Sequence, residues 1–68
     1  MFDEKRLRAA MVIADKSVKE LCEILDIAPS TFYRKCTNDG DFSRKEIDIL
    51  ANLLSLDNEA RNAIFFAD

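Results

Sequence analysis

The side chains best suited to chemistry are the basic ones in residues 30–45. Four Lys and Arg side chains stand there against two acidic ones, a net charge of +2, whereas residues 46–68 hold one Arg against five acids, a net of −4. A positive strip on a negative body contacts phosphates locally, while a weak overall field limits non-specific binding. By composition alone a basic pair is more often an ordinary solvated helix face. The basic residues are Arg34, Lys35, Arg44 and Lys45.

Catalysis is disfavoured by what the 68 residues lack. The chain has no His, the side chain most often used for acid-base work near neutral pH and the commonest metal ligand. Its two Cys, Cys22 and Cys36, lack the close spacing of zinc or redox motifs, and we expect them to be reduced and buried. A chain this short buries only about 60% of its unfolded surface. The sequence therefore predicts no enzyme, no metal site and no cofactor.

The charge and hydropathy patterns indicate one soluble, cytoplasmic domain over residues 1–68. Ten Lys and Arg against thirteen Asp and Glu give a net charge of −3, which disfavours indiscriminate binding to nucleic acid. No apolar run approaches the roughly 18 residues of a membrane span, and four of the first six residues are charged, unlike a signal peptide. We expect no contact with a membrane and infer no small-molecule ligand.

Apolar residues recur at steps of three and four, and with one Gly and one Pro the chain has few helix breaks, so the pattern predicts a compact all-α fold of five helices. The first helix is expected over residues 2–14. A capping box, Ser17 to Glu20, begins the second helix, which ends near Asp26. The inward positions predicted for these two helices are Leu7, Ala10, Met11 and Ala14, then Leu21, Cys22, Ile24 and Leu25.

Pro29 favours the start of a third helix, over residues 29–36, because its missing amide hydrogen is not needed there. A polar surface loop follows, and a second capping box begins a fourth helix over residues 43–55. Asp57 is positioned to cap the last helix, which carries more apolar surface than a terminal helix needs. This surface either fills the core or forms a dimer contact. Adjacent rings point about 100° apart, so one of Phe65 and Phe66 is expected inside and the other is the candidate for a dimer contact.

Two short helices joined by a turn of about three residues, over residues 17–36, are typical of a helix-turn-helix. The stretch from Ser17 to Lys35 resembles the signature of the Cro/CI-type (lambda repressor-like, XRE family) helix-turn-helix regulators, which are common in phages and mobile elements. Asp41-Phe42-Ser43 before an amphipathic helix, and the final Ile64-Phe65-Phe66, are similar to small members of that family. The resemblance implies a five-helix DNA-binding domain.

In this family the second helix of the motif enters the major groove, and the helix before it crosses the DNA backbone. The resemblance implies that Arg34 is the first choice for a base contact, because its planar fork of donors matches guanine O6 and N7. The residues implied at base edges are Pro29, Ser30, Tyr33 and Arg34, and those implied at phosphates are Ser17, Thr31, Lys35, Asn38 and Lys45.

The chain departs from the family pattern at several positions. The family usually has Thr-Gln where Ser17-Val18 stands, and Val18 lacks the side chain with which that Gln contacts phosphate. Cys22 replaces a small Ala, and Asp26 replaces a turn-forming Gly. Ala28 replaces a Ser, which removes a good cap for the third helix and shifts that role toward Ser30.

Two functions from different classes remain open. The first is a sequence-specific transcriptional regulator, a Cro/CI-like repressor that binds an operator in double-stranded DNA as a homodimer. The second is an acidic helical module, an antirepressor or adaptor, that keeps the same fold but binds protein. The first is the leading hypothesis, and the net charge of −3 and the absence of the family's Gln at Val18 keep the second open.

Overall fold

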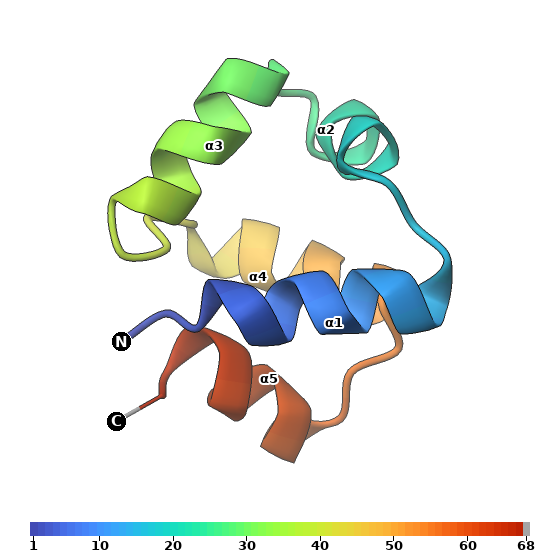
Figure 1. The fold of residues 1–68 in the computed structure, drawn as a ribbon, viewed down its shortest axis with the longest axis vertical. Coiled ribbons are helices and arrows are strands. Elements are labelled where there is room, and N and C mark those ends of the chain that lie inside the picture. The colour runs from blue at the N-terminus through green and yellow to red at the C-terminus, as the bar shows by residue number, and fades with distance from the viewer. Residues whose placement is uncertain (68) are drawn as a thin grey trace.

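The computed structural model describes residues 1–67, which form five helices joined by short loops (Figure 1). The helices are α1 (Glu4–Ala14), α2 (Val18–Leu25), α3 (Pro29–Thr37), α4 (Arg44–Leu53) and α5 (Asn58–Phe65). No strand occurs in this range, so the predicted all-α class and the number of helices are confirmed. Among the described residues, no helix has both the length and the apolar character that a membrane span requires.

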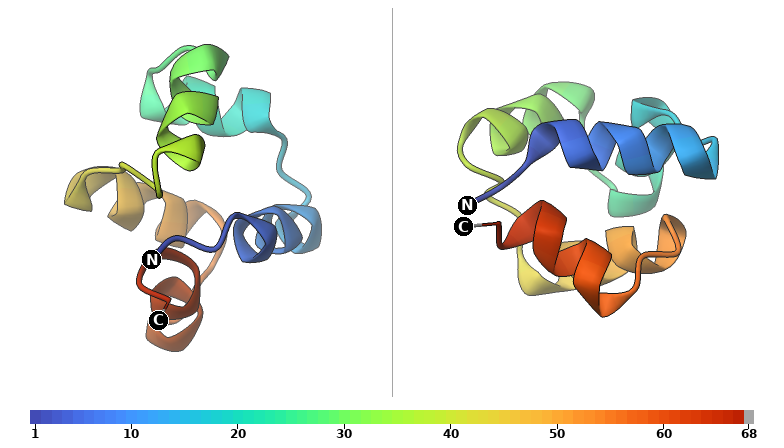
Figure 2. Two further views of the ribbon diagram at one scale, coloured as in Figure 1. Left: turned by 60° about the vertical axis from the view of Figure 1, so that its left-hand side comes forward. Right: turned by 60° about the horizontal axis from the view of Figure 1, so that its bottom comes forward.

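The five helices share one core. α5 packs along α1, while α2 contacts both α3 and α4. Figure 2 shows α2 and α3 as a pair on the side of the molecule away from α5. The four most deeply buried large side chains come from four different helices, so α2 and α3 are held by the same core as α1 and α4. Burying each of these four side chains stabilises the fold by roughly 1.5–3 kcal/mol. They are Leu7, Leu21, Phe32 and Leu50.

Hydrogen bonds at the helix starts confirm both predicted capping boxes. Glu20 N donates to Ser17 Oγ (3.2 Å) and Ser17 N to Glu20 Oε1 (3.3 Å). At the start of α4, Glu46 N donates to Ser43 Oγ (3.1 Å) and Ser43 N to Glu46 Oε1 (2.8 Å). The predicted cap of α5 is also present, because Asp57 accepts from Ala60 N at 2.7 Å. Three of the five helix starts are therefore fixed by residues that the sequence pattern identified.

The start of α1, the end of α4 and the cap of α3 differ from the expectations. α1 begins at Glu4 instead of Phe2, because the Asp3 carboxylate accepts from Arg6 N at 3.1 Å and caps the helix. α4 ends at Leu53, two residues before the predicted end, since Ser55 has a left-handed backbone (φ 55°). The start of α3 has Ala28 as its N-cap with no side-chain hydrogen bond, and Ser30, the expected replacement cap, lies inside the helix.

Ile24 was expected on the inward face of α2, yet its side chain is half exposed. Leu21 and Cys22 are buried, and Val18 and Leu25 pack against the core beside them. At 100° per residue, Ile24 lies about 110° from the middle of the face that these four form. The inward face of α2 is therefore narrower than expected and does not include Ile24.

A segment before α1 closes one end of the core. The Phe2 ring lies 5.8 Å from the Phe42 ring and 5.7 Å from the Phe65 ring, centroid to centroid. Asp3 N donates to the Ile64 carbonyl (2.7 Å), and Phe2 N donates to Asp39 Oδ1 (3.1 Å). The segment before α1 and the end of α5 accordingly lie side by side (Figure 2). We call the rings of Phe2, Phe32, Phe42 and Phe65 the aromatic cluster.

The turn between α2 and α3 contains a strained residue that gives a testable prediction. Asp26 ends α2 with φ 57° and ψ 47°, the left-handed region in which glycine has no steric penalty. Its carboxylate also stands at the negative end of the helix dipole. Asp26→Gly is therefore expected to raise the free energy of unfolding by about 0.5–1 kcal/mol. Urea titration measures this change. Asp26→Asn, which removes only the charge, is the control, and a glycine variant no more stable than the wild type contradicts the prediction.

Candidate nucleic-acid interface

One side of α3 is buried and the other is open. Phe32 and Cys36, one turn apart, are 1% and 6% exposed and fix the rotation of the helix against the core. The four residues implied at base edges all lie on the exposed side: Pro29, Ser30, Tyr33 and Arg34. Residues three and four positions apart are neighbours on a helix, so these four form one continuous surface over the first two turns.

Tyr33 and Arg34 differ in how firmly they are held. The Tyr33 ring rests edge-on against Phe32, with the centroids 5.9 Å apart, and is 47% exposed. The exposed Arg34 guanidinium lies in none of the ion pairs found within residues 1–67. Its donors are therefore available to a ligand, while the Tyr33 ring has a defined orientation next to them.

The residues implied at phosphates fall into two groups. Asn38 and Lys45 are exposed on the loop after α3 and the first turn of α4, and Thr31 is half-buried on α3. Ser17 is exposed at the start of α2, but its hydroxyl already takes part in the capping box. Lys35 is engaged inside the chain, because its Nζ lies 3.2 Å from Glu46 Oε1 and both side chains are only 17% exposed.

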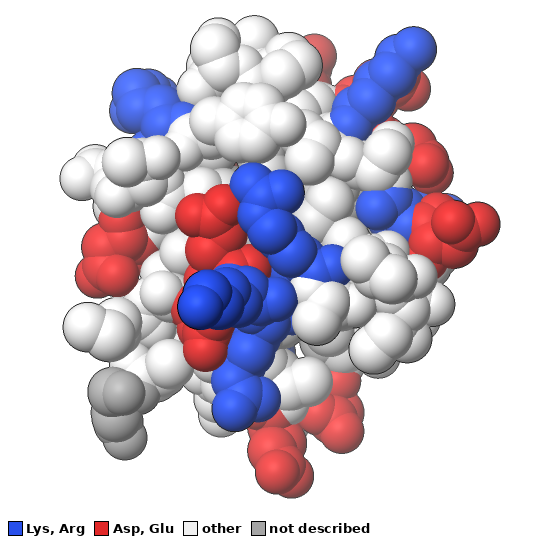
Figure 3. All heavy atoms as spheres, viewed as in Figure 1, with Lys and Arg blue, Asp and Glu red and all other residues white. Residues whose placement is uncertain are grey.

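The charges on the molecule are mixed. Figure 3 shows Lys and Arg side chains gathered near the middle of one face, directly beside Asp and Glu, with a mostly uncharged surface around them. In α1, Arg8 Nη2 lies 2.7 Å from Glu4 Oε2, and this hydrogen bond raises the pKa of Arg8. Any contact with phosphates must therefore come from the few basic side chains outside such pairs, as on α3 and at the start of α4.

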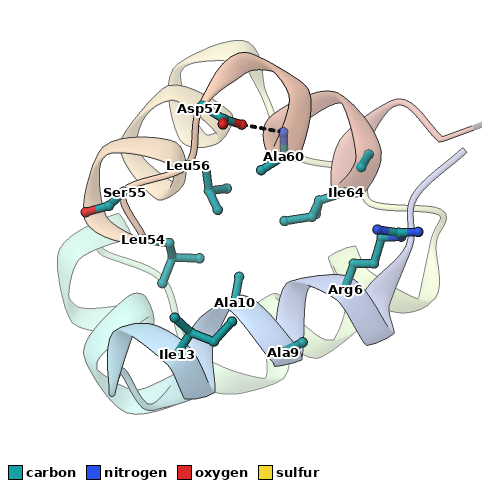
Figure 4. Close-up of a pocket in the computed structure, with 11 residues that line it drawn as sticks. Arg6, Ala9, Ala10, Ile13, Leu54, Ser55, Leu56, Asp57, Ala60 and Ile64 are labelled. Atoms are coloured by element: carbon teal, nitrogen blue, oxygen red, sulfur yellow. Dashed lines mark hydrogen bonds between the residues drawn. The ribbon is translucent and has the colours of Figure 1, made fainter.

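A hollow of about 330 Å³ lies between α1 and α5 (Figure 4). Its lining is mainly Ala and aliphatic side chains from α1, α5 and the loop before α5. Of its charged residues, Arg6 pairs with Asp3, and Asp57 caps α5 through the bond drawn in Figure 4. No group of three or more potential metal ligands occurs within residues 1–67. The hollow is suited to an apolar group.

Both thiols lie in the core and are free. Burial raises the pKa of Cys22, and burial together with the nearby charge of Glu4 raises the pKa of Cys36 to about 11. A thiolate is the reactive form, so both thiols are expected to react with iodoacetamide at pH 8 at least about tenfold more slowly in the folded chain than in urea. Mass spectrometry of quenched samples measures both rates, and equal rates contradict the prediction.

Phe65 and Phe66 differ in burial. Phe65 is 6% exposed and belongs to the aromatic cluster, so it is removed from the dimer candidates. Phe66 is 54% exposed and lies beside a hollow that Arg44 and Arg61 also line. This agrees with the expectation that one ring packs inside. Only Phe66 remains as a candidate for a contact between subunits.

Sequence reasoning missed the role of Glu46 beyond its capping box. Burial of the Glu46 side chain disfavours the charged form and raises its pKa. Hydrogen bonds from the Ser43 backbone and from Lys35 stabilise the carboxylate and outweigh this effect, so the pKa of Glu46 is lowered. Lys35 stands 11 positions earlier, and no local pattern links the two residues.

Comparisons with models of protein families, with curated proteins and with solved structures found no match to this chain.

Proposed function

We propose that this chain is a sequence-specific DNA-binding transcriptional regulator, a Cro/CI-like repressor of phage or mobile-element type. It acts in the cytoplasm, catalyses no reaction and needs no cofactor. Helix α3 docks in the major groove, and α2 and the start of α4 lie against the DNA backbone. The observation that carries the proposal is the exposed surface over the first two turns of α3, where hydrogen-bonding side chains stand on a helix held by the core.

The side chains of that surface have defined tasks in the proposed complex. Arg34 donates to guanine O6 and N7, and Ser30 and Tyr33 add hydrogen bonds to neighbouring base edges. Lys45 and Asn38 contact phosphates, which set the register of the protein on the duplex without contributing sequence information. The small number of unpaired basic residues keeps non-specific affinity low.

Selection from random duplexes, followed by fluorescence anisotropy over a salt series, tests the proposal. A DNA-binding regulator is expected to enrich one sequence. The logarithm of its binding constant is expected to fall linearly with the logarithm of the salt concentration, with a slope of about −0.9 for each phosphate contacted. No enrichment and no binding at low salt contradict it. That result favours the acidic interaction module, which the net charge of −3 and the exposed Ile13 beside an apolar hollow also support.

The proposed regulator binds as a homodimer, and Phe66 gives this a test. In a two-fold dimer the α3 helices lie about 34–36 Å apart, so the selected site is expected to be an inverted repeat with half-sites about 10 base pairs apart. Phe66→Gln is expected to weaken dimerisation and operator binding and to leave the monomer folded, because the ring is mostly outside the core. Sedimentation and anisotropy measure both effects.

Val12→Gln is the control for Phe66→Gln, because it also replaces an exposed apolar side chain, on α1, with a polar one. A wild type that sediments as a monomer and binds a single asymmetric half-site, with the same affinity after Phe66→Gln, contradicts the dimer.

A further inference from the structure

Lys35 is tied to three groups that all lie outside α3. Its Nζ is 3.2 Å from Glu46 Oε1, donates to the Asp41 carbonyl at 3.2 Å and lies 5.9 Å from the centroid of the Phe42 ring. The side chain is 17% exposed, so its charge is mostly withdrawn from solvent. A lysine held in this way has little reach toward a phosphate.

Glu46 connects the same lysine to the start of α4. The oxygen that faces Lys35, Oε1, also accepts from Ser43 N at 2.8 Å in the capping box. α4 is itself fixed in the core by Ile47 and Leu50, 7% and 0% exposed. One carboxylate oxygen therefore joins the last turn of α3 to the first turn of a rigidly packed helix.

This connection adds a side-chain tie at the C-terminal turn of α3. Phe32 and Cys36 hold one side of the helix against the core, and backbone bonds such as Asp41 N to the Lys35 carbonyl at 3.0 Å join its last turn to the following loop. The Lys35–Glu46 pair links the same turn to α4 from outside the core. Arg34 directly precedes Lys35, so movement of that turn moves the guanidinium. A displacement of about 1 Å is enough to spoil a bidentate contact with a base.

From these contacts we infer that Lys35 and Glu46 form a clamp that positions α3 for base recognition, and that Lys35 is not a phosphate ligand. The inference rests on the proposed DNA-binding function and replaces the phosphate contact that the family resemblance implied for Lys35. Both members are positioning residues, since neither touches the DNA. The clamp predicts that removing either charge lowers specific affinity without removing a phosphate contact.

Three variants separate positioning from phosphate binding. Lys35→Met keeps the aliphatic stem and removes the charge. Glu46→Gln removes the opposite charge but keeps an acceptor suited to a capping box. Lys45→Met makes the same charge change as Lys35→Met at an exposed lysine that lies in none of the ion pairs of residues 1–67. Urea titration of each variant establishes that it is folded before binding is measured.

Anisotropy on the selected site and on a random duplex, each over a salt series, gives the decisive readout. Lys35→Met and Glu46→Gln are each expected to weaken binding to the selected site at least about fivefold, the lower end for a lost base contact, with the salt slope unchanged. The double variant is expected to lose no more than either single one, because both changes open the same clamp. Lys45→Met is expected to reduce the slope by about 0.9 on both duplexes.

The clamp is overturned if Lys35→Met reduces the salt slope as Lys45→Met does, or if Glu46→Gln binds as tightly as the wild type or more tightly. Amide hydrogen exchange without DNA supplies a second test. Exchange at Asn38 and Asp41, whose amides bond to the last turn of α3, is expected to accelerate in both clamp variants and not in Lys45→Met. Unchanged exchange overturns the clamp. A wild type that binds no duplex refutes the proposed function itself, and the role of the clamp in recognition with it.

Discussion

Replacing Gly40 with alanine is expected to lower the free energy of unfolding by about 3 kcal/mol or more, a large part of the roughly 3–10 kcal/mol available to a chain of this length. Two causes add. Gly40 has φ 70°, where a side chain costs about 1–2 kcal/mol. A Cβ at this position also overlaps Phe2 Cγ and stands 2.6 Å from Phe2 Cβ, so the ring must leave its place in the aromatic cluster. Urea titration followed by circular dichroism measures the loss.

A double-mutant cycle with Phe2→Ala isolates the contact. Phe2 packs against Phe42 and Phe65, and we expect Phe2→Ala alone to cost about 2–3 kcal/mol, somewhat less than a fully buried ring. With the ring already absent, Gly40→Ala is expected to cost only the backbone component of about 1–2 kcal/mol. Additive costs, or a Gly40→Ala variant as stable as the wild type, contradict this account of the turn.

Arg34→Ala is expected to weaken binding to the preferred DNA site by about 1–3 kcal/mol, roughly 5- to 150-fold, and to relax the preference at one base position. The proposed complex loses a bidentate contact to guanine, and the alanine leaves the fold intact because Arg34 is exposed and lies in none of the ion pairs of the described residues. Anisotropy on the selected duplex and on single-base variants of it measures both effects.

Lys45→Ala is the matched control for Arg34→Ala. It removes an exposed cation at the start of α4 and is expected to weaken all duplexes similarly, since phosphate contacts are independent of sequence. An equal loss for Arg34→Ala on the preferred site and on random duplexes shows that Arg34 makes no base contact.

The parts of the fold that the sequence predicted are those set by neighbouring residues. Ser17 and Ser43 begin helices because each makes hydrogen bonds three positions away, within the range of a local pattern. Asp26 ends a helix through its own backbone conformation. Helix periodicity placed Leu7, Leu21, Phe32 and Leu50 in the core for the same local reason.

The parts that could not be predicted depend on contacts between distant positions. Phe2 was assigned to a helix, but its ring packs against Phe42 and Phe65, and its amide bonds to Asp39, 37 residues away. The face of α3 followed from local spacing, whereas the pairing of Lys35 with Glu46 required the turn between α3 and α4 in three dimensions. Local patterns thus indicated which residues of α3 point outward and which pack inward, and gave no information on the ion pair that ties its last turn to α4.

The aromatic cluster has a consequence for how the chain folds during synthesis. It joins residue 2 to residue 65, so the ring of Phe2 has no complete site until α5 has emerged from the ribosome. The contacts between α2 and α3 are local and can form much earlier, whereas closing the loop between distant rings carries a larger entropic cost. In a nascent chain without α5, the rings of Phe2 and Phe42 lack their contacts with Phe65, and such exposed apolar surface is what chaperones and proteases recognise.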